Sequence, residues 1–323
     1  MKLYLNVQKN ILSLSLIYVL IINISVNINS TEVDKHETFA LIVNTSNDFP
    51  NASPPANNTD AFPGQTLQAY YALKSLGYDD DHIVLMVYHE GDDFIDYDGD
   101  GKNDPTNAII DLENDDITKE NLRNELQKIK NRLGYNDELI IYLVNHGCLM
   151  SSTSAGLYFD CGDMLSEEEL SSWLKDVYCE KIVILADFCY SGNFISSLAE
   201  PGRICISSSE NDKISWYYWD WTESFSEDYK GIFGNSGSVF FHPFWVKIKQ
   251  GYSFQEAFSY ANETYKRWIN VDPDSKETVE AQNPQISAKE RTFIDEVLRF
   301  FRWVWWLISN IFGLHNDTKT GSL

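Results

Sequence analysis

The chain has 323 residues, of which 43% are hydrophobic and 14% aromatic, enough for one large domain or two small ones with an apolar core. Its 25 Lys and Arg residues against 48 Asp and Glu residues give a formal charge of −23. This charge argues against a nucleic-acid partner and disfavours binding to anionic membrane surfaces. Aromatic and β-branched residues run throughout, which excludes disorder for most of the chain.

The first 30 residues differ from the rest of the chain. Lys2 and Lys9 flank the start of the chain, an apolar run follows over residues 11–22, and residues 23–30 are polar. This order is typical of a secretory signal; an uncleaved anchor and a buried N-terminal helix are the alternatives. Glycosylation sequons fit export and occur at Asn44, Asn51, Asn57, Asn262 and Asn316. We therefore expect an exported protein, either extracellular or membrane-associated.

Residues 36–290 alternate between short apolar runs and helical patterns. The apolar runs are too short for helices, and they lie at residues 39–43, 82–88, 138–144, 181–186 and 203–207. Nearly continuous hydrophobicity is typical of strands that are covered on both faces. The helical patterns lie at residues 60–76, 118–133, 166–177, 239–249 and 253–268. The alternation predicts an α/β domain with a mainly parallel sheet and helices on both faces.

Two of these helices carry start signals. Ser166 is followed three positions later by Glu169, which is the pattern of a capping box. Thr118 has no acidic residue at that position, so we expect only a threonine cap there.

The carboxyl ends of two predicted strands carry reactive side chains. The run over residues 138–144 leads to His146 and Gly147, and the run over residues 181–186 leads to Asp187 and Cys189. If these strands are parallel neighbours, the imidazole and the thiol meet at one sheet edge, where the imidazole can activate the sulfur as a nucleophile. The backbone N–H groups of Gly147 and Cys189 could then hold a developing oxyanion. The alternative is a buried cysteine and an unrelated loop histidine; a glycine after each favours the catalytic pair.

These two motifs, IIYLVNHG and VILADFCYSG, resemble those of the caspase-fold cysteine peptidases, and most closely those of the legumain family. The resemblance covers residues 39–287, and the catalytic subunits of GPI-anchor transamidases are similar too. It implies a caspase-like three-layer α/β sandwich with a mainly parallel six-stranded sheet. It also implies that Cys189 and His146 are the catalytic pair and that Gly147 lines the oxyanion hole. The expected reaction is endopeptidase cleavage of a peptide or protein substrate through a thioester, without a cofactor.

The same resemblance places Asp187 and Ser215 in the pocket for P1, the substrate residue before the scissile bond. Legumains carry an Arg-His pair soon after the first strand, and residues 46–62 of this chain contain neither residue. An acidic pocket without that arginine leaves two P1 preferences open, Asn or Asp on one side and Lys or Arg on the other. The family also places an orienting asparagine in this region, for which Asn44, Asn47 and Asn57 are candidates.

Residues 96–104 read DYDGDGKND and form a second constellation. Asp96, Asp98, Asp100 and Asp104 occupy positions 1, 3, 5 and 9 of a calcium-loop pattern, with a glycine at position 6. The twelfth position is Asn107, so the usual bidentate carboxylate is missing there. The sequence therefore leaves two hypotheses, a structural calcium site and a solvated acidic turn.

The five cysteines are too few for a disulfide scaffold. Cys148 and Cys161 flank one predicted loop and could form a disulfide, whereas Cys179 and Cys205 are expected to be buried thiols.

The C-terminal part of the chain is aromatic. Residues 291–314 carry Arg299 and Arg302 within an aromatic run, which we interpret as an amphipathic helix at a membrane interface or on a partner protein. Residues 315–323 form a polar tail. Two alternatives to the peptidase remain: a transamidase or peptide ligase that uses the same thioester, and a catalytically inactive protein that binds a partner.

Overall fold

The computed structural model describes residues 36–45, 61–88, 107–159, 161–218, 237–271 and 282–311. The chain divides into two compact units, Met1–Glu37 and Thr38–Leu323, and nearly all the described residues belong to the second. The expected signal segment over residues 1–30 and the tail over residues 315–323 lie outside the described residues.

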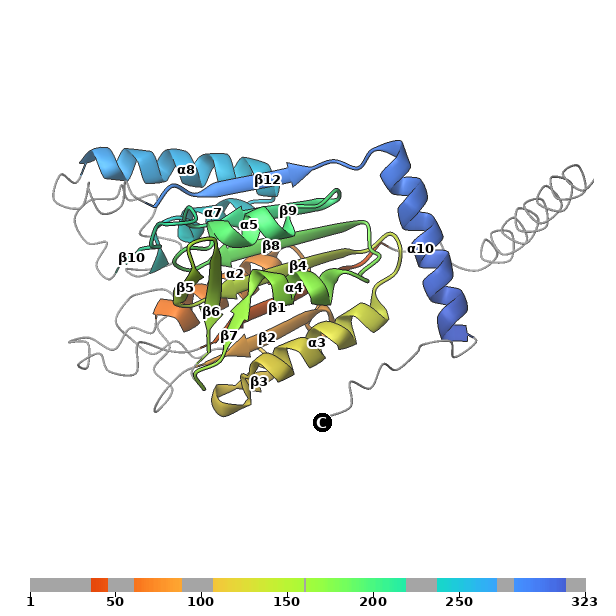
Figure 1. Cartoon of the computed structure of the whole chain (residues 1–323). Helices are drawn as coiled ribbons and strands as arrows, with labels where there is room; N and C mark the ends of the chain where they lie inside the picture. The colour runs from red at the N-terminus through yellow and green to blue at the C-terminus, as the bar shows by residue number, and fades with distance from the viewer. Residues whose placement is uncertain are drawn as a thin grey trace, which may run out of the picture. The chain divides into compact units, whose positions relative to one another are not determined.

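A seven-stranded sheet forms the centre of the second unit, in the order β12-β9-β8-β4-β1-β2-β3 (Figure 1). Its strands are β1 (Thr38–Asn44), β2 (Ile83–Val87), β3 (Leu112–Glu113), β4 (Glu138–Val144), β8 (Lys181–Asp187), β9 (Arg203–Ser207) and β12 (Gln285–Lys289). All neighbouring strands are parallel except β12, which pairs antiparallel with β9. The mainly parallel α/β fold is therefore confirmed, with seven strands where six were expected. The two strands outside the five apolar runs are β3, which has only two residues, and β12, whose sequence QISAK is half polar.

Alternate residues of the central strands bury their side chains in opposite layers. On β4, Ile140 and Tyr142 pack toward one hydrophobic cluster, whereas Leu139 and Ile141 pack toward the other. One cluster contains helices α2 (Ala61–Ser75), α7 (Phe241–Lys249) and α8 (Phe254–Val271). The other contains α3 (Lys119–Arg132), α4 (Glu167–Leu174) and α5 (Gly192–Leu198). The sheet is thus covered on both faces, as the nearly continuous apolar runs predict.

The predicted helix starts are confirmed. The Thr118 hydroxyl accepts a hydrogen bond from the N–H of Asn121 at 3.1 Å, at the start of α3. At α4 the Ser166 hydroxyl accepts from the N–H of Glu169 at 3.2 Å, and the Glu169 carboxylate accepts from the N–H of Ser166 at 3.1 Å, which completes the capping box.

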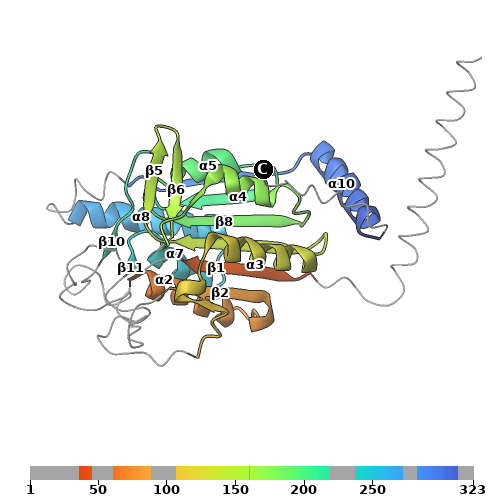
Figure 2. The same cartoon turned by 60° about the horizontal axis from the view of Figure 1, so that its bottom comes forward.

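Smaller elements lie at the carboxyl edge of the central sheet. Strands β5 (Gly147–Ser151), β6 (Ser154–Tyr158) and β7 (Met164–Ser166) form an antiparallel sheet that continues directly from β4. Strands β10 (Tyr217–Tyr218) and β11 (Gly237–Ser238) form a short pair near it (Figure 2).

Helix α10 (Phe293–Ile311) lies at the other end of the sheet, where the strands begin (Figure 1). Two 3-10 turns, Asp80–His82 and Asn114–Asp116, complete the described elements. Among the described residues, no helix combines the length and the apolarity needed to cross a membrane.

Candidate active site

The structure brings together the ends of the two strands that carry the predicted catalytic pair. Strands β4 and β8 are parallel neighbours, and Val144 is paired with Asp187 in their register. His146 and Cys189 each follow two residues after this last pair. They therefore leave the same edge of the sheet at the same level, as is typical of sites in open α/β sheets.

Gly147 packs directly against the backbone of Cys189. A Cβ atom on Gly147 would lie 2.0 Å from the Cys189 carbonyl oxygen and 2.7 Å from the Phe188 ring. Only a residue without a side chain permits this approach. The backbone N–H of Gly147 also donates a hydrogen bond to the Cys189 thiol. This contact places the His146–Gly147 segment beside the sulfur.

A strained turn presents Cys189 at the end of β8. Tyr190, the next residue, has a φ of 65°, which is uncommon for a residue with a side chain. Several hydrogen bonds hold the turn: the N–H of Tyr190 donates to the Lys213 carbonyl at 2.7 Å, and the Ser209 hydroxyl donates to the Phe188 carbonyl at 3.1 Å. Ser191 and Ser209 share a further hydroxyl contact at 3.2 Å. The surrounding structure thus fixes a conformation that an isolated turn would rarely adopt.

Ser215 lies beside Cys189 on the side away from Gly147 in sequence. Its backbone N–H donates to Cys189 Sγ at 3.3 Å, and its carbonyl accepts from the thiol at 3.7 Å. The predicted pocket residue Ser215 is therefore in contact with the sulfur through its main chain.

Asp187 is fully buried behind this contact, at 0% exposure. Its carboxylate accepts hydrogen bonds from three hydroxyl groups: Tyr142 at 3.0 Å, Ser238 at 3.0 Å and Ser215 at 3.4 Å. Burial, followed by the negative charge of Asp187, holds the pKa of Tyr142 well above its ordinary value. Asp187 therefore links β4, β11 and the Ser215 loop, and it reaches the sulfur through Ser215.

Burial determines the protonation states of the pair. It lowers the pKa of His146 to about 4. It raises the pKa of the Cys189 thiol, an effect that the N–H groups of Ser215 and Gly147 oppose. At neutral pH the site therefore holds a neutral imidazole and a protonated thiol, so the imidazole is available as a base.

The His146 ring packs edge-on against Phe62 of α2, with ring centroids 4.9 Å apart and an interplanar angle of 87°. The preceding residue, Asn145, is buried, and its amide donates to the Thr45 hydroxyl at 2.6 Å and to the Tyr158 carbonyl at 2.7 Å. These contacts fix the segment that carries the imidazole to β1 and β6.

Asn44, a candidate for the orienting asparagine, bonds the backbone of Tyr88 with both ends of its amide, at 2.9 and 3.1 Å. It therefore joins the ends of β1 and β2. The other candidates, Asn47 and Asn57, lie outside the described residues.

Several residues of the site carry no sequence signal. Tyr142 reads as an ordinary strand residue, and Ser238 follows Asp187 by 51 positions. Phe62 and Thr45 likewise belong to segments whose distance from His146 only the fold reveals. Asn145 could have been found, because it directly precedes the histidine.

The remaining predicted features are placed as follows. The calcium-loop residues Asp96, Asp98, Asp100 and Asp104 lie outside the described residues. Cys148 and Cys161 are both free thiols, so the disulfide considered between them is absent from the structure. Cys179 and Cys205 are buried thiols, as predicted.

Comparison with known proteins agrees with this geometry. The model of the Peptidase C13 family matches residues 39–268, which is more than half of the chain. The crystal structure of caspase-1 from Spodoptera frugiperda is similar with a TM-score of 0.47 and 13% identity, over 80% of this chain and 92% of that chain. No curated protein sequence gives a significant match. The protein is a cysteine peptidase of the legumain type. It belongs to the Peptidase C13 family.

Proposed function

We propose that this protein is an endopeptidase in which Cys189 is the nucleophile and His146 the general base. The packing of Gly147 on the Cys189 carbonyl carries the proposal, because it holds the imidazole-bearing segment beside the sulfur. His146 takes the thiol proton as Sγ attacks the scissile carbonyl carbon, and it returns that proton to the leaving amine. A water molecule activated by the same imidazole then hydrolyses the thioester.

The backbone N–H of Gly147 has a second role in this mechanism. It already donates to Sγ in the free protein, so it lies within reach of an oxygen on a carbon bonded to that sulfur. With the N–H of Cys189 it would stabilise the oxyanion of the tetrahedral intermediate.

The P1 pocket is proposed to favour a side chain that donates hydrogen bonds. Asp187 is ionisable, and its described partners are three hydroxyl groups. A P1 aspartate would bring a second negative charge toward it, which is unfavourable at short range. An asparagine amide or a basic side chain suits the Ser215–Asp187 side of the site better.

Peptide cleavage tests this proposal. The full chain is incubated with a peptide library whose P1 position varies, and the products are identified by mass spectrometry. Cleavage after Asn, Lys or Arg by the wild type, together with its loss in Cys189→Ala and in His146→Ala, is the expected result. Undiminished cleavage by Cys189→Ala contradicts the proposal. An added amine nucleophile separates the alternatives: an amide product would show transfer by the same acyl-enzyme, and a free acid shows hydrolysis.

We also propose that residues 96–104 bind calcium as a structural brace, on the carboxylate spacing alone. An increase in melting temperature with added calcium that is lost in Asp96→Ala/Asp98→Ala supports this. Equal melting temperatures with calcium and with chelator contradict it.

A further inference from the structure

Helix α10 carries an apolar surface on the side that faces away from the domain. Five side chains follow one another at spacings of four, three, four and three residues, which places them on one side of a helix. They are Ile294 (68% exposed), Leu298 (47%), Phe301 (53%), Trp305 (66%) and Ile308 (36%). Phe293, at the start of the helix, is 83% exposed. We call these six residues the outer stripe.

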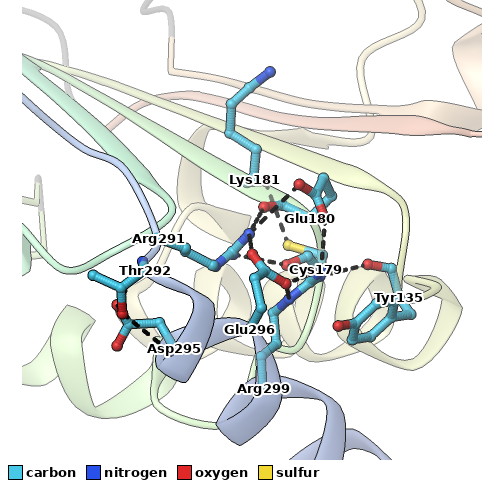
Figure 3. A network of polar contacts seen from close by, with 9 residues as sticks. All are labelled: Tyr135, Cys179, Glu180, Lys181, Arg291, Thr292, Asp295, Glu296 and Arg299. Atoms are coloured by element: carbon cyan, nitrogen blue, oxygen red, sulfur yellow. Dashed lines mark hydrogen bonds and ion pairs between the residues drawn. The ribbon is translucent and has the colours of Figure 1, made fainter.

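Polar contacts attach the opposite side of α10 to the domain (Figure 3). The Arg299 guanidinium contacts the Glu180 carboxylate at 2.7 Å and donates to the carbonyls of Tyr135 and Cys179 at 2.9 and 3.2 Å. It also lies 3.6 Å from the centroid of the Tyr135 ring. Arg291 donates to the Cys179 carbonyl at 3.1 Å. Because these contacts fix the inner side of the helix, the outer stripe faces away from the domain.

The outer stripe exposes on the order of 600 Å² of apolar side chain, at the upper end for a single patch on a soluble monomer. Trp303 also packs on Tyr135 at 5.2 Å, so both sides of the helix are apolar. A helix that is apolar on both sides is normally covered on both. The outer stripe is therefore a binding surface.

The location of α10 indicates what covers this surface. Tyr135 and Cys179, which hold the helix, precede β4 and β8, so α10 lies at the edge where the parallel strands begin. The described part of the main domain begins at the same edge, at Thr38 on β1, which is paired with Glu138. The chain before Thr38 is 37 residues long and contains the apolar run over residues 11–22. A membrane-inserted segment there would bring this edge to the bilayer.

From these observations we infer that the outer stripe of α10 binds the surface of a lipid bilayer. Tryptophan and phenylalanine side chains favour the membrane–water interface. The net charge of −23 opposes anionic lipids, so the surface fits a bilayer of neutral headgroups. Strands β4 and β8 have seven residues each and separate the two edges by about 20 Å. The Cys189 edge therefore faces away from the bilayer, toward the soluble parts of substrates. This inference does not depend on the proposed peptidase activity.

The experiment uses the full chain and phosphatidylcholine vesicles with brominated acyl chains, which quench tryptophan fluorescence on contact. The test variant is Leu298→Gln/Phe301→Gln/Trp305→Gln. The matched control is Leu76→Gln/Ile109→Gln/Tyr252→Gln, whose parent side chains are 41%, 56% and 48% exposed at other places. Circular dichroism and melting temperature establish that both variants are folded.

The expected result is quenching of the wild type and the control, with vesicle affinity about tenfold or more weaker in the test variant. Quenching distinguishes α10 from the N-terminal segment, because residues 1–30 contain no tryptophan. Three outcomes overturn the inference. One is equal quenching of the test variant and the control, and another is vesicle binding without quenching. The third is a wild-type dimer in sedimentation that the test variant abolishes, which would assign the stripe to a second copy of the chain.

Discussion

Replacing Gly147 with alanine inserts a methyl group into the contact between β5 and the Cys189 turn. The added carbon would lie 2.0 Å from the Cys189 carbonyl oxygen, and ordinary contact begins at 3.4 Å. The two segments must therefore separate by about 1.4 Å. The obstructing oxygen belongs to the backbone, and the other close atom belongs to Phe188, which is buried against Phe194 at 4.9 Å. Neither can move aside cheaply.

The expected effect on catalysis follows from this displacement. A misplacement of about 1 Å costs on the order of 100-fold in rate, or about 2.7 kcal/mol of transition-state stabilisation. We expect kcat/KM to fall by about 100-fold or more, and the free energy of unfolding to fall by about 1–3 kcal/mol from overpacking. Initial rates on a cleaved peptide and urea denaturation measure the two quantities.

Gly156→Ala is the matched control for this substitution. Gly156 lies on β6 of the same small sheet, and its added Cβ would meet the flexible Met150 side chain at 3.0 Å. We expect activity within about threefold of the wild type, because that side chain can adjust. If folded Gly147→Ala retained kcat/KM within the same range, the idea that the His146 segment must touch the Cys189 backbone would be refuted.

Three further predictions follow from the charges and contacts of the site. Because burial lowers the pKa of His146 to about 4, the imidazole stays neutral as pH falls, and kcat/KM should drop with an apparent pKa near 4; a limb near 6.5 would contradict this. His242 is buried, and its pKa is lowered to about 4, so the unfolded chain takes up its proton near pH 6.5 and the folded chain does not. Stability should thus be lost between pH 6.5 and 4, by up to about 3 kcal/mol from this group. Urea denaturation at pH 7 and pH 4.5 should show a smaller loss in His242→Asn, and an equal loss would argue against the assignment. Asp187→Asn places an amide donor among three hydroxyl donors, so we expect about 1–3 kcal/mol of destabilisation and a lower kcat; an unchanged melting temperature would show that the hydroxyls have other acceptors.

Local patterns predicted those parts of the fold that local physics determines. The runs that became β1, β2, β4, β8 and β9 are continuously apolar because both faces of these strands are covered. The Ser166–Glu169 capping box needs only four consecutive residues. Strand β12 escaped prediction because its residues are half polar and its antiparallel pairing with β9 depends on the chain between them.

The candidate site divides in the same way. His146 and Cys189 could be predicted because each follows an apolar strand, and parallel pairing alone brings such ends together. The support around them could not, because it joins distant segments: Ser238 reaches Asp187, and Thr45 reaches Asn145 across 100 residues. Asp187 was expected to line the pocket; its full burial behind Ser215 depends on side chains from three elements. The outer stripe of α10 was visible as an aromatic run, but only its attachment through Arg299 shows which side faces outward.

The most direct measurement of the central claim is the mass of the covalent adduct formed with a peptide that carries a thiol-reactive acyloxymethyl ketone. At pH 7 the free thiol of Cys189 is protonated, so attack on the probe should depend on the neighbouring imidazole. We predict one adduct, on Cys189, formed quickly by the wild type and at least about 100-fold more slowly by His146→Ala. An adduct on another cysteine, or equal rates in the two proteins, would contradict the account.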